Sequence, residues 1–99
     1  MEIIKNIDKE KLEVKIVGRL DTITAPTLEA EFKQSVTDDV KELVLDFKEL
    51  EYISSAGLRV LLAAQKVMNK QGSMKLINVS EEVNEIFEVT GFSDILTIE

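Results

Sequence analysis

Residues 2–22 carry the hydrophobic pattern of two strands joined by a short turn. Residues 12–17 read Leu-Glu-Val-Lys-Ile-Val, so apolar side chains alternate with charged ones, and this period of two predicts a strand with one buried face. A shorter, isoleucine-rich run at 2–7 predicts an edge strand, and the polar turn at 8–11 between the two runs is typical of an antiparallel hairpin. We expect Gly18 to close the second strand and a loop to follow it.

Further along the chain, helical spacing alternates with short apolar runs. Pro26 fits the first turn of a helix, where its missing N–H costs nothing, and apolar residues then recur every four positions up to Val36. Apolar runs at 43–47, 74–78 and 95–98 predict three more strands. The run at 43–47 is almost entirely apolar, which is typical of a strand covered on both faces.

The strongest helical pattern begins at Ser55 and continues to about Lys70. Gly72 stands just past its end, where glycine is a natural C-cap. A third helix is expected after Ser80, whose side chain can cap it. Two glutamates follow in the first turn of that helix, where the helix dipole favours them, and Gly91 ends it.

These segments predict an α/β fold in a single domain covering residues 1–99. The expected order is ββαβαβαβ, with three to four helices. Helices between strands imply parallel crossovers, and the N-terminal hairpin adds an antiparallel pair, so the predicted sheet is small and mixed. A chain of 99 residues suits one domain with a hydrophobic core of its own.

The composition excludes several classes of function but says little about the fold. The chain has 12 Lys and Arg against 19 Asp and Glu, a formal charge of −7, which argues against binding to nucleic acid. It has no His and no Cys, so thiol or imidazole chemistry, disulfides and most transition-metal sites are excluded. No apolar run is long enough to span a membrane, and the first residues are unlike a signal peptide. We therefore expect no enzyme, no cofactor and no metal site.

A helical wheel divides the segment from residue 55 into a core stripe and an outer face. The core stripe consists of Gly57, Leu61, Ala64 and Met68, with Val60 and Val67 beside it. The outer face holds Ser55, Arg59, Lys66 and Lys70. Leu62 lies near Arg59 on that face. An outward leucine is common on protein surfaces, so Leu62 is either an unremarkable surface residue or a partner contact.

Two serines stand at the expected start of this helix. Ser54 fits the N-cap, where its side-chain oxygen accepts a backbone N–H, and Ile53 and Leu58 then occupy the positions of a hydrophobic staple. Ser55 is left over and points outward. A phosphate on Ser55 would sit at a helix N-terminus, where free N–H groups and the dipole favour an anion, and Arg59 one turn on could reach it.

Two aspartates lie near predicted strand ends. Asp21 falls in the loop after residue 18, and Asp46 near the end of the strand at 43–47. A strand-end aspartate can be a phosphoacceptor, but the acidic pair and the lysine that a receiver domain requires are missing. The simpler interpretation of both is hydrogen bonding to backbone N–H groups in their own loops.

Four segments together carry a resemblance to a known family. They are Gly18-Arg19-Leu20-Asp21, Thr24-Ala25, Leu43-Val44-Leu45-Asp46-Phe47 and Tyr52-Ile53-Ser54-Ser55-Ala56-Gly57-Leu58-Arg59-Val60-Leu61. In this combination they resemble the STAS domain, the domain of bacterial anti-sigma factor antagonists. The Ser-Ser-Ala-Gly-Leu stretch after a Leu-Asp strand is the most specific part, and the resemblance covers nearly the whole chain.

The resemblance implies a cytoplasmic partner switch. Family members bind an anti-sigma factor that is also a serine kinase, which frees the sigma factor. The kinase phosphorylates a serine at the start of a helix and so ends binding, and a metal-dependent serine phosphatase of the PP2C type reverses the modification. Aligning the family motif on Gly57-Leu58 puts the phosphorylated serine at Ser55 and the motif's aspartate at Ser54, which is the second candidate acceptor.

The resemblance also implies where the partner binds. Asp21 matches the aspartate of the family's Gly-x-Leu-Asp loop, which lies beside the serine in the family fold. The expected partner surface consists of Asp21, Thr22, Ser54, Ser55, Arg59, Leu62 and Lys66. The alternative is a STAS scaffold that is never phosphorylated and works in another complex, such as a stress-signalling or transport assembly.

Overall fold

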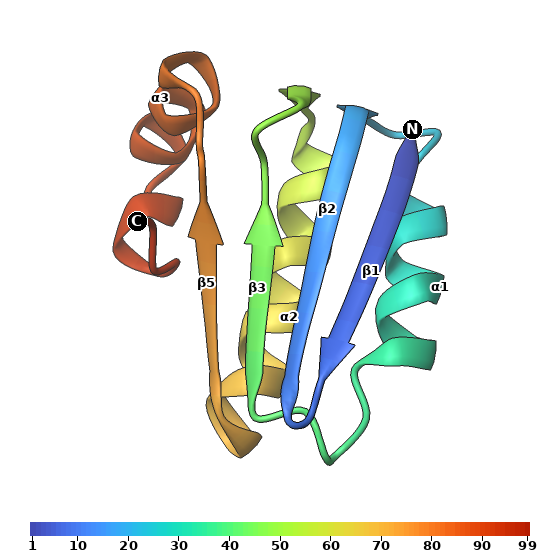
Figure 1. Ribbon diagram of the computed structural model, residues 1–99. Helices are drawn as coiled ribbons and strands as arrows, with labels where there is room; N and C mark the ends of the chain where they lie inside the picture. Colours follow the sequence, from blue (N-terminus) through green and yellow to red (C-terminus); the bar gives the residue numbers. More distant parts are fainter.

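The computed structural model describes all residues, 1–99, as one mixed sheet with helices (Figure 1). The elements are β1 (Glu2–Asp8), β2 (Lys11–Leu20), α1 (Ala25–Ser35), β3 (Glu42–Asp46), β4 (Leu50–Ile53), α2 (Ser55–Gln71), β5 (Ser73–Ile77), α3 (Glu81–Thr90) and a 3₁₀ turn at Phe92–Asp94. This architecture confirms the predicted α/β fold with its N-terminal hairpin and mixed sheet.

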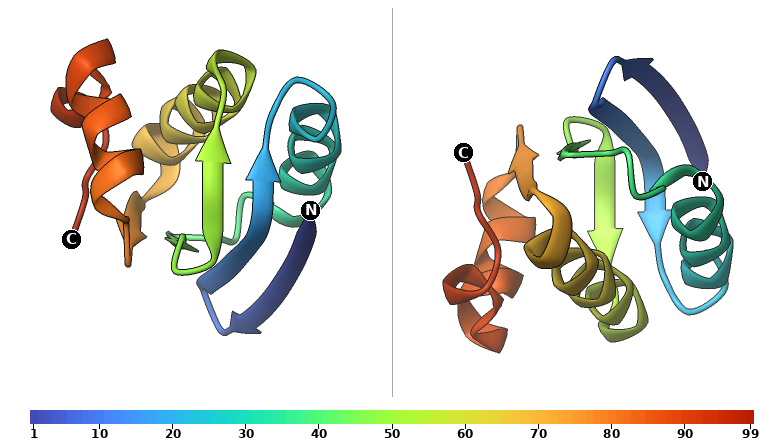
Figure 2. Two further views of the ribbon diagram at one scale, coloured as in Figure 1. Left: turned by 90° about the horizontal axis from the view of Figure 1, so that it is seen from above. Right: turned by 90° about the horizontal axis from the view of Figure 1, so that it is seen from below.

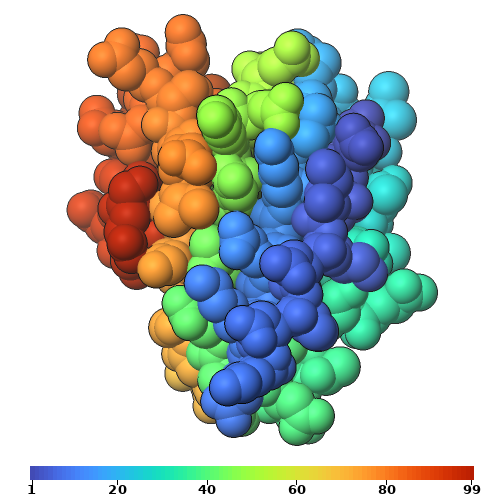
Figure 3. All heavy atoms as spheres, in the orientation of Figure 1, coloured from blue at the N-terminus to red at the C-terminus, as the bar shows by residue number.

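The strands lie in the order β1-β2-β3-β5, and β4 pairs with the end of β2. β1 runs antiparallel to β2, whereas every other pair is parallel. The helices lie on one side of the sheet, with α1 behind β1 and β2, α2 behind β2 and β3, and α3 beyond β5 (Figures 1 and 2). The other side of the sheet faces solvent (Figure 3).

The alternation of side chains along β2 explains this one-sided cover. Leu12, Val14 and Ile16 are buried on the helix side, and the charged Glu13 and Lys15 between them are half-buried on the open side. Because side chains alternate in a strand, these three apolar positions all face the helices. The same side carries the buried Leu43 and Leu45 of β3 and Met74 and Leu76 of β5, so one core holds sheet and helices together. Val44, between the two leucines, is buried on the open side and lies outside that core.

The second strand is longer than the sequence predicted. Gly18 does not end it, because β2 continues to Leu20 through a change of register between Gly18 and Arg19. Gly18 has φ +100°, a backbone conformation that glycine adopts without strain. The irregularity redirects the end of β2 from β3 to β4, so the predicted loop at 18–22 is in part a strand.

The strand β4 was missed, and the strand expected at 95–98 does not form. β4 has only four residues with an exposed pair at its centre, and its partner is the redirected end of β2. At the C-terminus a 3₁₀ turn is followed by a single bridge from Ile98 to Leu76. The observed order is therefore ββαββαβα instead of ββαβαβαβ.

Three details of the helices differ from expectation. Val67 is 43% exposed, so it is not part of the core beside Val60, whereas the polar Gln65 is buried. Gly72 follows α2 in an extended conformation, where a Cβ would overlap the carbonyl oxygen of Lys41. The glycine is thus needed for a close chain approach and not for a left-handed cap.

Candidate functional site

The N-terminal ends of α1 and α2 meet the carboxyl ends of β2 and β4 at one end of the molecule, at the top of Figure 1. A backbone hydrogen bond of 2.8 Å from the Ser54 N–H to the Leu20 carbonyl ties the start of α2 to the end of β2. Another of 2.8 Å joins Ala25 to Asp21 at the start of α1. Residues from the two predicted site segments are therefore neighbours.

Ser54 is the N-cap of α2, as predicted. Its Oγ accepts a hydrogen bond of 3.3 Å from the Gly57 N–H, which would otherwise lack a partner in the first turn. Ile53 and Leu58 on either side of the cap are both buried, at the positions of a hydrophobic staple. The Ser54 side chain is half-buried and has a structural role.

Gly57 brings α2 unusually close to β2. A Cβ at this position would lie 2.7 Å from Cγ of Leu20 and 3.0 Å from Cγ1 of Ile53, both of which are buried side chains. The absence of a side chain therefore sets the distance between the first turn of the helix and the strand end. This close approach fixes the start of α2, and with it the neighbouring serines, against the end of β2.

Ser55 is the first residue of α2 and is exposed. Its hydroxyl makes no hydrogen bond within the chain, and the first turn of α2 contains no acidic residue. Arg59, one turn further, is also exposed and has no ion-pair partner. An anion at Ser55 would thus meet free backbone N–H groups, the positive end of the helix dipole and an available guanidinium.

Asp21 organises the loop beside this helix start. Its Oδ1 accepts hydrogen bonds of 3.0 Å from the N–H groups of Ile23 and Thr24 and one of 3.2 Å from the Thr24 hydroxyl. Hydrogen bonds from the Thr24 backbone, then from that of Ile23, together with the nearby Arg19 charge, lower the pKa of the Asp21 carboxyl. The turn presents Thr22 and Ile23 to solvent, and Ile23 is 85% exposed.

Asp46 makes hydrogen bonds to two loops. It accepts hydrogen bonds of 3.0 Å from the Lys48 N–H and from the Asn78 side-chain amide. The bond from Lys48 is the predicted contact within its own loop, whereas the bond from Asn78 joins this loop to the one after β5 and was not predicted. Asp46 does not belong to the candidate site.

The structure brings some of the expected partner surface together and separates the rest. Thr22 and Arg59 line one shallow hollow of about 210 Å³ between the ends of α1 and α2, beside Ser55. Leu62 is half-buried rather than fully outward. Lys66 is exposed about two turns beyond Arg59 along α2, and so lies away from the serines.

The sequence did not predict a contact between Arg19 and Tyr52 near this site. The guanidinium of Arg19 lies 4.4 Å from the centre of the Tyr52 ring, a cation–π contact between paired residues of β2 and β4. Arginine and tyrosine are common in energetically important parts of protein interfaces. Their proximity depends on the β2–β4 pairing, so no local signal could have revealed it.

The structure shows neither a cluster of metal ligands nor a membrane-spanning helix. No three Asp or Glu side chains gather where they could hold a metal ion. None of the helices combines the length and the apolar character that a membrane span requires.

Comparison with known sequences finds one family and several relatives. The STAS domain family matches residues 1–99. BtrV of Bordetella bronchiseptica, whose name describes it as an anti-sigma factor antagonist, is 40% identical over 82 residues, which are 82% of this chain and 71% of BtrV. The anti-sigma-B factor antagonist of Bacillus subtilis is 33% identical over 92% of this chain and 84% of its own length.

Comparison with solved structures confirms the fold. An anti-sigma factor antagonist from Mycobacterium paratuberculosis has a TM-score of 0.88 at 23% identity, covering 98% of this chain and 83% of its own. Unphosphorylated SpoIIAA, an anti-sigma factor antagonist, has a TM-score of 0.78 at 17% identity, covering 99% and 87%. At these identities the likeness establishes the arrangement of strands and helices.

Proposed function

This chain belongs to the STAS domain family, and we propose that it acts as an anti-sigma factor antagonist whose binding ends when Ser55 is phosphorylated. The names of the B. subtilis and B. bronchiseptica relatives support the first part of the proposal. The surface around Ser55 supports the second. In the unmodified state the chain would bind an anti-sigma factor and so release a sigma factor.

The observation that carries the switch is the division of roles between two adjacent hydroxyls. Ser54 caps α2 and is half-buried, whereas Ser55 is exposed and makes no hydrogen bond. A kinase can therefore modify Ser55 without removing an interaction that the fold needs. The other candidate, Ser54, would lose its cap on modification.

The same geometry explains why phosphorylation would act on binding and not on folding. A phosphate adds a charge of about −1.5 to −2. At the start of α2 the free N–H groups and the dipole tolerate that charge, and Arg59 can pair with it, so the fold persists. A partner surface that closes over a neutral hydroxyl has no group prepared for the charge, and such a mismatch costs several kcal/mol of binding free energy.

We further propose that the anti-sigma factor is itself the serine kinase and that a metal-dependent serine phosphatase of the PP2C type restores the free serine. The chain supplies only the acceptor hydroxyl and the surrounding surface, and the partners supply the chemistry. We place these reactions in the cytoplasm, where a sigma factor works. With no His and no Cys, no exposed hydroxyl of the chain has an evident base to activate it.

The test is phosphorylation by the cognate anti-sigma factor with ATP, followed by intact-mass measurement. The chain and its Ser54→Ala variant should each gain one phosphate, and Ser55→Ala should gain none. Ser54→Ala should also lose about 1 kcal/mol of stability as the cap disappears. If Ser55→Ala is fully phosphorylated and Ser54→Ala is not, the acceptor is Ser54.

One observation favours the alternative of a constitutive scaffold. Ser54 stands where the family motif has an aspartate, so a kinase that reads that aspartate would not recognise this chain. Binding to the anti-sigma factor that persists with ATP present, without any mass change, would support the scaffold. A Ser54→Asp variant, which keeps a capping side chain, would then show whether the aspartate alone restores phosphorylation.

A further inference from the structure

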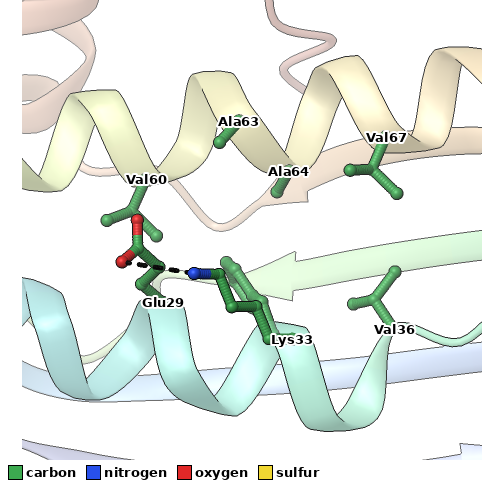
Figure 4. A pocket seen from close by; sticks show the side chains of 8 residues that line it. Glu29, Lys33, Val36, Val60, Ala63, Ala64 and Val67 are labelled. Carbon is green, nitrogen blue, oxygen red and sulfur yellow. Dashed lines mark ion pairs between the residues drawn. The ribbon is translucent and has the colours of Figure 1, made fainter.

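An apolar groove of about 280 Å³ lies between α1 and α2 (Figure 4). Its apolar lining consists of Phe32, Val36, Val60, Ala63, Ala64 and Val67. Glu29 and Lys33 form an ion pair of 3.9 Å on the α1 side of the groove. The two alanines leave room for an incoming side chain, and the exposed Val67 offers it apolar contact.

The helix α2 beside this groove is positively charged. It contains no Asp or Glu, although the chain as a whole has a charge of −7. Arg59, Lys66 and Lys70 are all exposed, and none of them has an acidic partner within 4 Å. At 100° per residue these cations fall next to Ala63, at the edge of the groove. The groove is therefore bordered by unpaired positive charge.

The helix α3 has the opposite character. It contains no Lys or Arg, and its exposed face carries Glu81, Glu82, Glu85 and Glu88. None of these glutamates forms an ion pair within the chain. Val89 is 81% exposed among them, and the half-buried Ile86 extends the apolar strip. With ten residues, α3 is about 15 Å long.

We propose that α3 of one copy of this chain docks into the α1–α2 groove of a second copy. Val89 enters the groove beside Ala63 and Ala64, and the glutamates of α3 face the basic residues of α2. Within one molecule α3 lies beyond β5, and the groove lies at the opposite side of α2, so the contact joins two molecules (Figure 1).

This contact uses different surfaces on its two sides. A pair joined in this way still has one free groove and one free α3, so association continues head to tail until a ring closes or the protein is exhausted. Because the occupant is a second copy, the proposal does not rest on the anti-sigma factor or on phosphorylation. The two proposals can therefore fail separately.

The test is sedimentation equilibrium of the purified protein over a micromolar to millimolar concentration series. The weight-average mass should rise above that of the monomer. Lys66→Glu spoils only the groove side and Glu85→Lys only the α3 side, and each should weaken association by about tenfold or more through like-charge contact. Glu10→Lys, an exposed change in the β1–β2 turn, alters the net charge as Glu85→Lys does and should associate like the parent chain.

Mixing tests whether α3 and the groove are the two sides of one contact. In an equal mixture of the Lys66→Glu and Glu85→Lys chains, each contact between unlike chains pairs opposite charges at positions 66 and 85, so the mixture should associate more strongly than either variant alone. A chain that carries both Lys66→Glu and Glu85→Lys should associate with itself, because the charges at the two positions are exchanged and still attract. The proposal is overturned if the parent chain stays monomeric. It is also overturned if both variants are folded by circular dichroism and associate as strongly as the parent chain.

Discussion

At the start of α2, the Ser54 hydroxyl is engaged in capping and the Ser55 hydroxyl is free in solvent. The sequence predicted this difference, because one cap needs one hydroxyl and the cap position follows from the helical pattern. It could not predict how tightly the site is held. The approach of Gly57 to Leu20 and the tie between Ser54 and Leu20 depend on the redirected end of β2.

We expect the two simplest changes of Ser55 to separate binding from switching. Ser55→Ala should bind the anti-sigma factor with or without ATP, because it has no acceptor. Ser55→Asp should bind more than about a hundredfold more weakly, equivalent to about 3 kcal/mol, because a charge meets a surface adapted to a neutral group. Calorimetric titration measures both affinities, and thermal unfolding should show both variants folded. Equal affinity of the two variants would remove Ser55 from the interface.

The charge of Asp21 should stabilise its loop in a pH-dependent way. The folded-state pKa of this carboxyl lies below the ordinary value of 3.8, so the ionised form is favoured in the folded chain. Its contribution is present above pH 3.8 and is lost as the pH falls through the lower folded value. Asp21→Asn keeps an acceptor oxygen without the charge, so its melting temperature should be lower at neutral pH. The difference from the parent chain should shrink in acid, and a constant difference would contradict the prediction.

At the scale of elements, helices were predicted better than strand ends. The helical spacing of α2 and its cap are local properties, and the sequence alone indicates them. The extension of β2 and the existence of β4 depend on each other across thirty residues of chain, so neither has a local signal. The candidate site contains both kinds of element, which is why Ser55 was predicted and the Arg19–Tyr52 pair was not.

The close contact of α2 with β2 predicts that Gly57→Ala destabilises the fold. Alanine should favour the helix by up to about 1 kcal/mol. The new Cβ would lie 2.7 Å from Cγ of Leu20, a fully buried side chain that has little space to move, and such overpacking costs about 1–3 kcal/mol. The cost of overlap should therefore exceed the gain in helix propensity, and Gly57→Ala should unfold at a lower urea concentration than the parent chain. Ala63→Gly, on the exposed face, isolates the propensity effect and should lose about 1 kcal/mol.

Leu62 tests how far the partner surface extends over α2. The side chain is half-buried, so Leu62→Glu should cost about 1 kcal/mol of stability. Binding to the anti-sigma factor should fall about tenfold if the interface reaches this turn. Leu62→Ala is the control, because it removes the apolar contact without adding charge. Binding unchanged in both variants would confine the interface to the first turn of α2.

At the scale of the whole molecule, the tail after α3 completes the core even though it forms no strand. Leu96 is 5% exposed within the core cluster, and the Leu76 N–H donates a hydrogen bond of 2.9 Å to the Thr97 carbonyl. The sequence predicted that this tail returns to the sheet. It could not predict that the 3₁₀ turn shortens the return to one bridge, because that turn depends on packing against α3.

A pair of neighbouring substitutions measures the contribution of this tail. Leu96→Ala should cost about 2–5 kcal/mol of unfolding free energy, as is typical of a buried leucine. Ile95→Ala, at a position 48% exposed, should change it by about 0.5 kcal/mol or less. Urea unfolding of the two variants gives the comparison. Equal effects would mean that the tail is not fixed against the sheet.

The free hydroxyl at position 55 also affects how the regulation of this chain can evolve. Because no hydrogen bond of the fold uses it, a substitution of Ser55 by alanine carries no penalty in stability. A gene duplicate could therefore lose its response to the kinase in one step while keeping its shape. A change at Ser54 would first have to compensate for a lost cap. Regulated and unregulated descendants of such a chain are separated by a single codon.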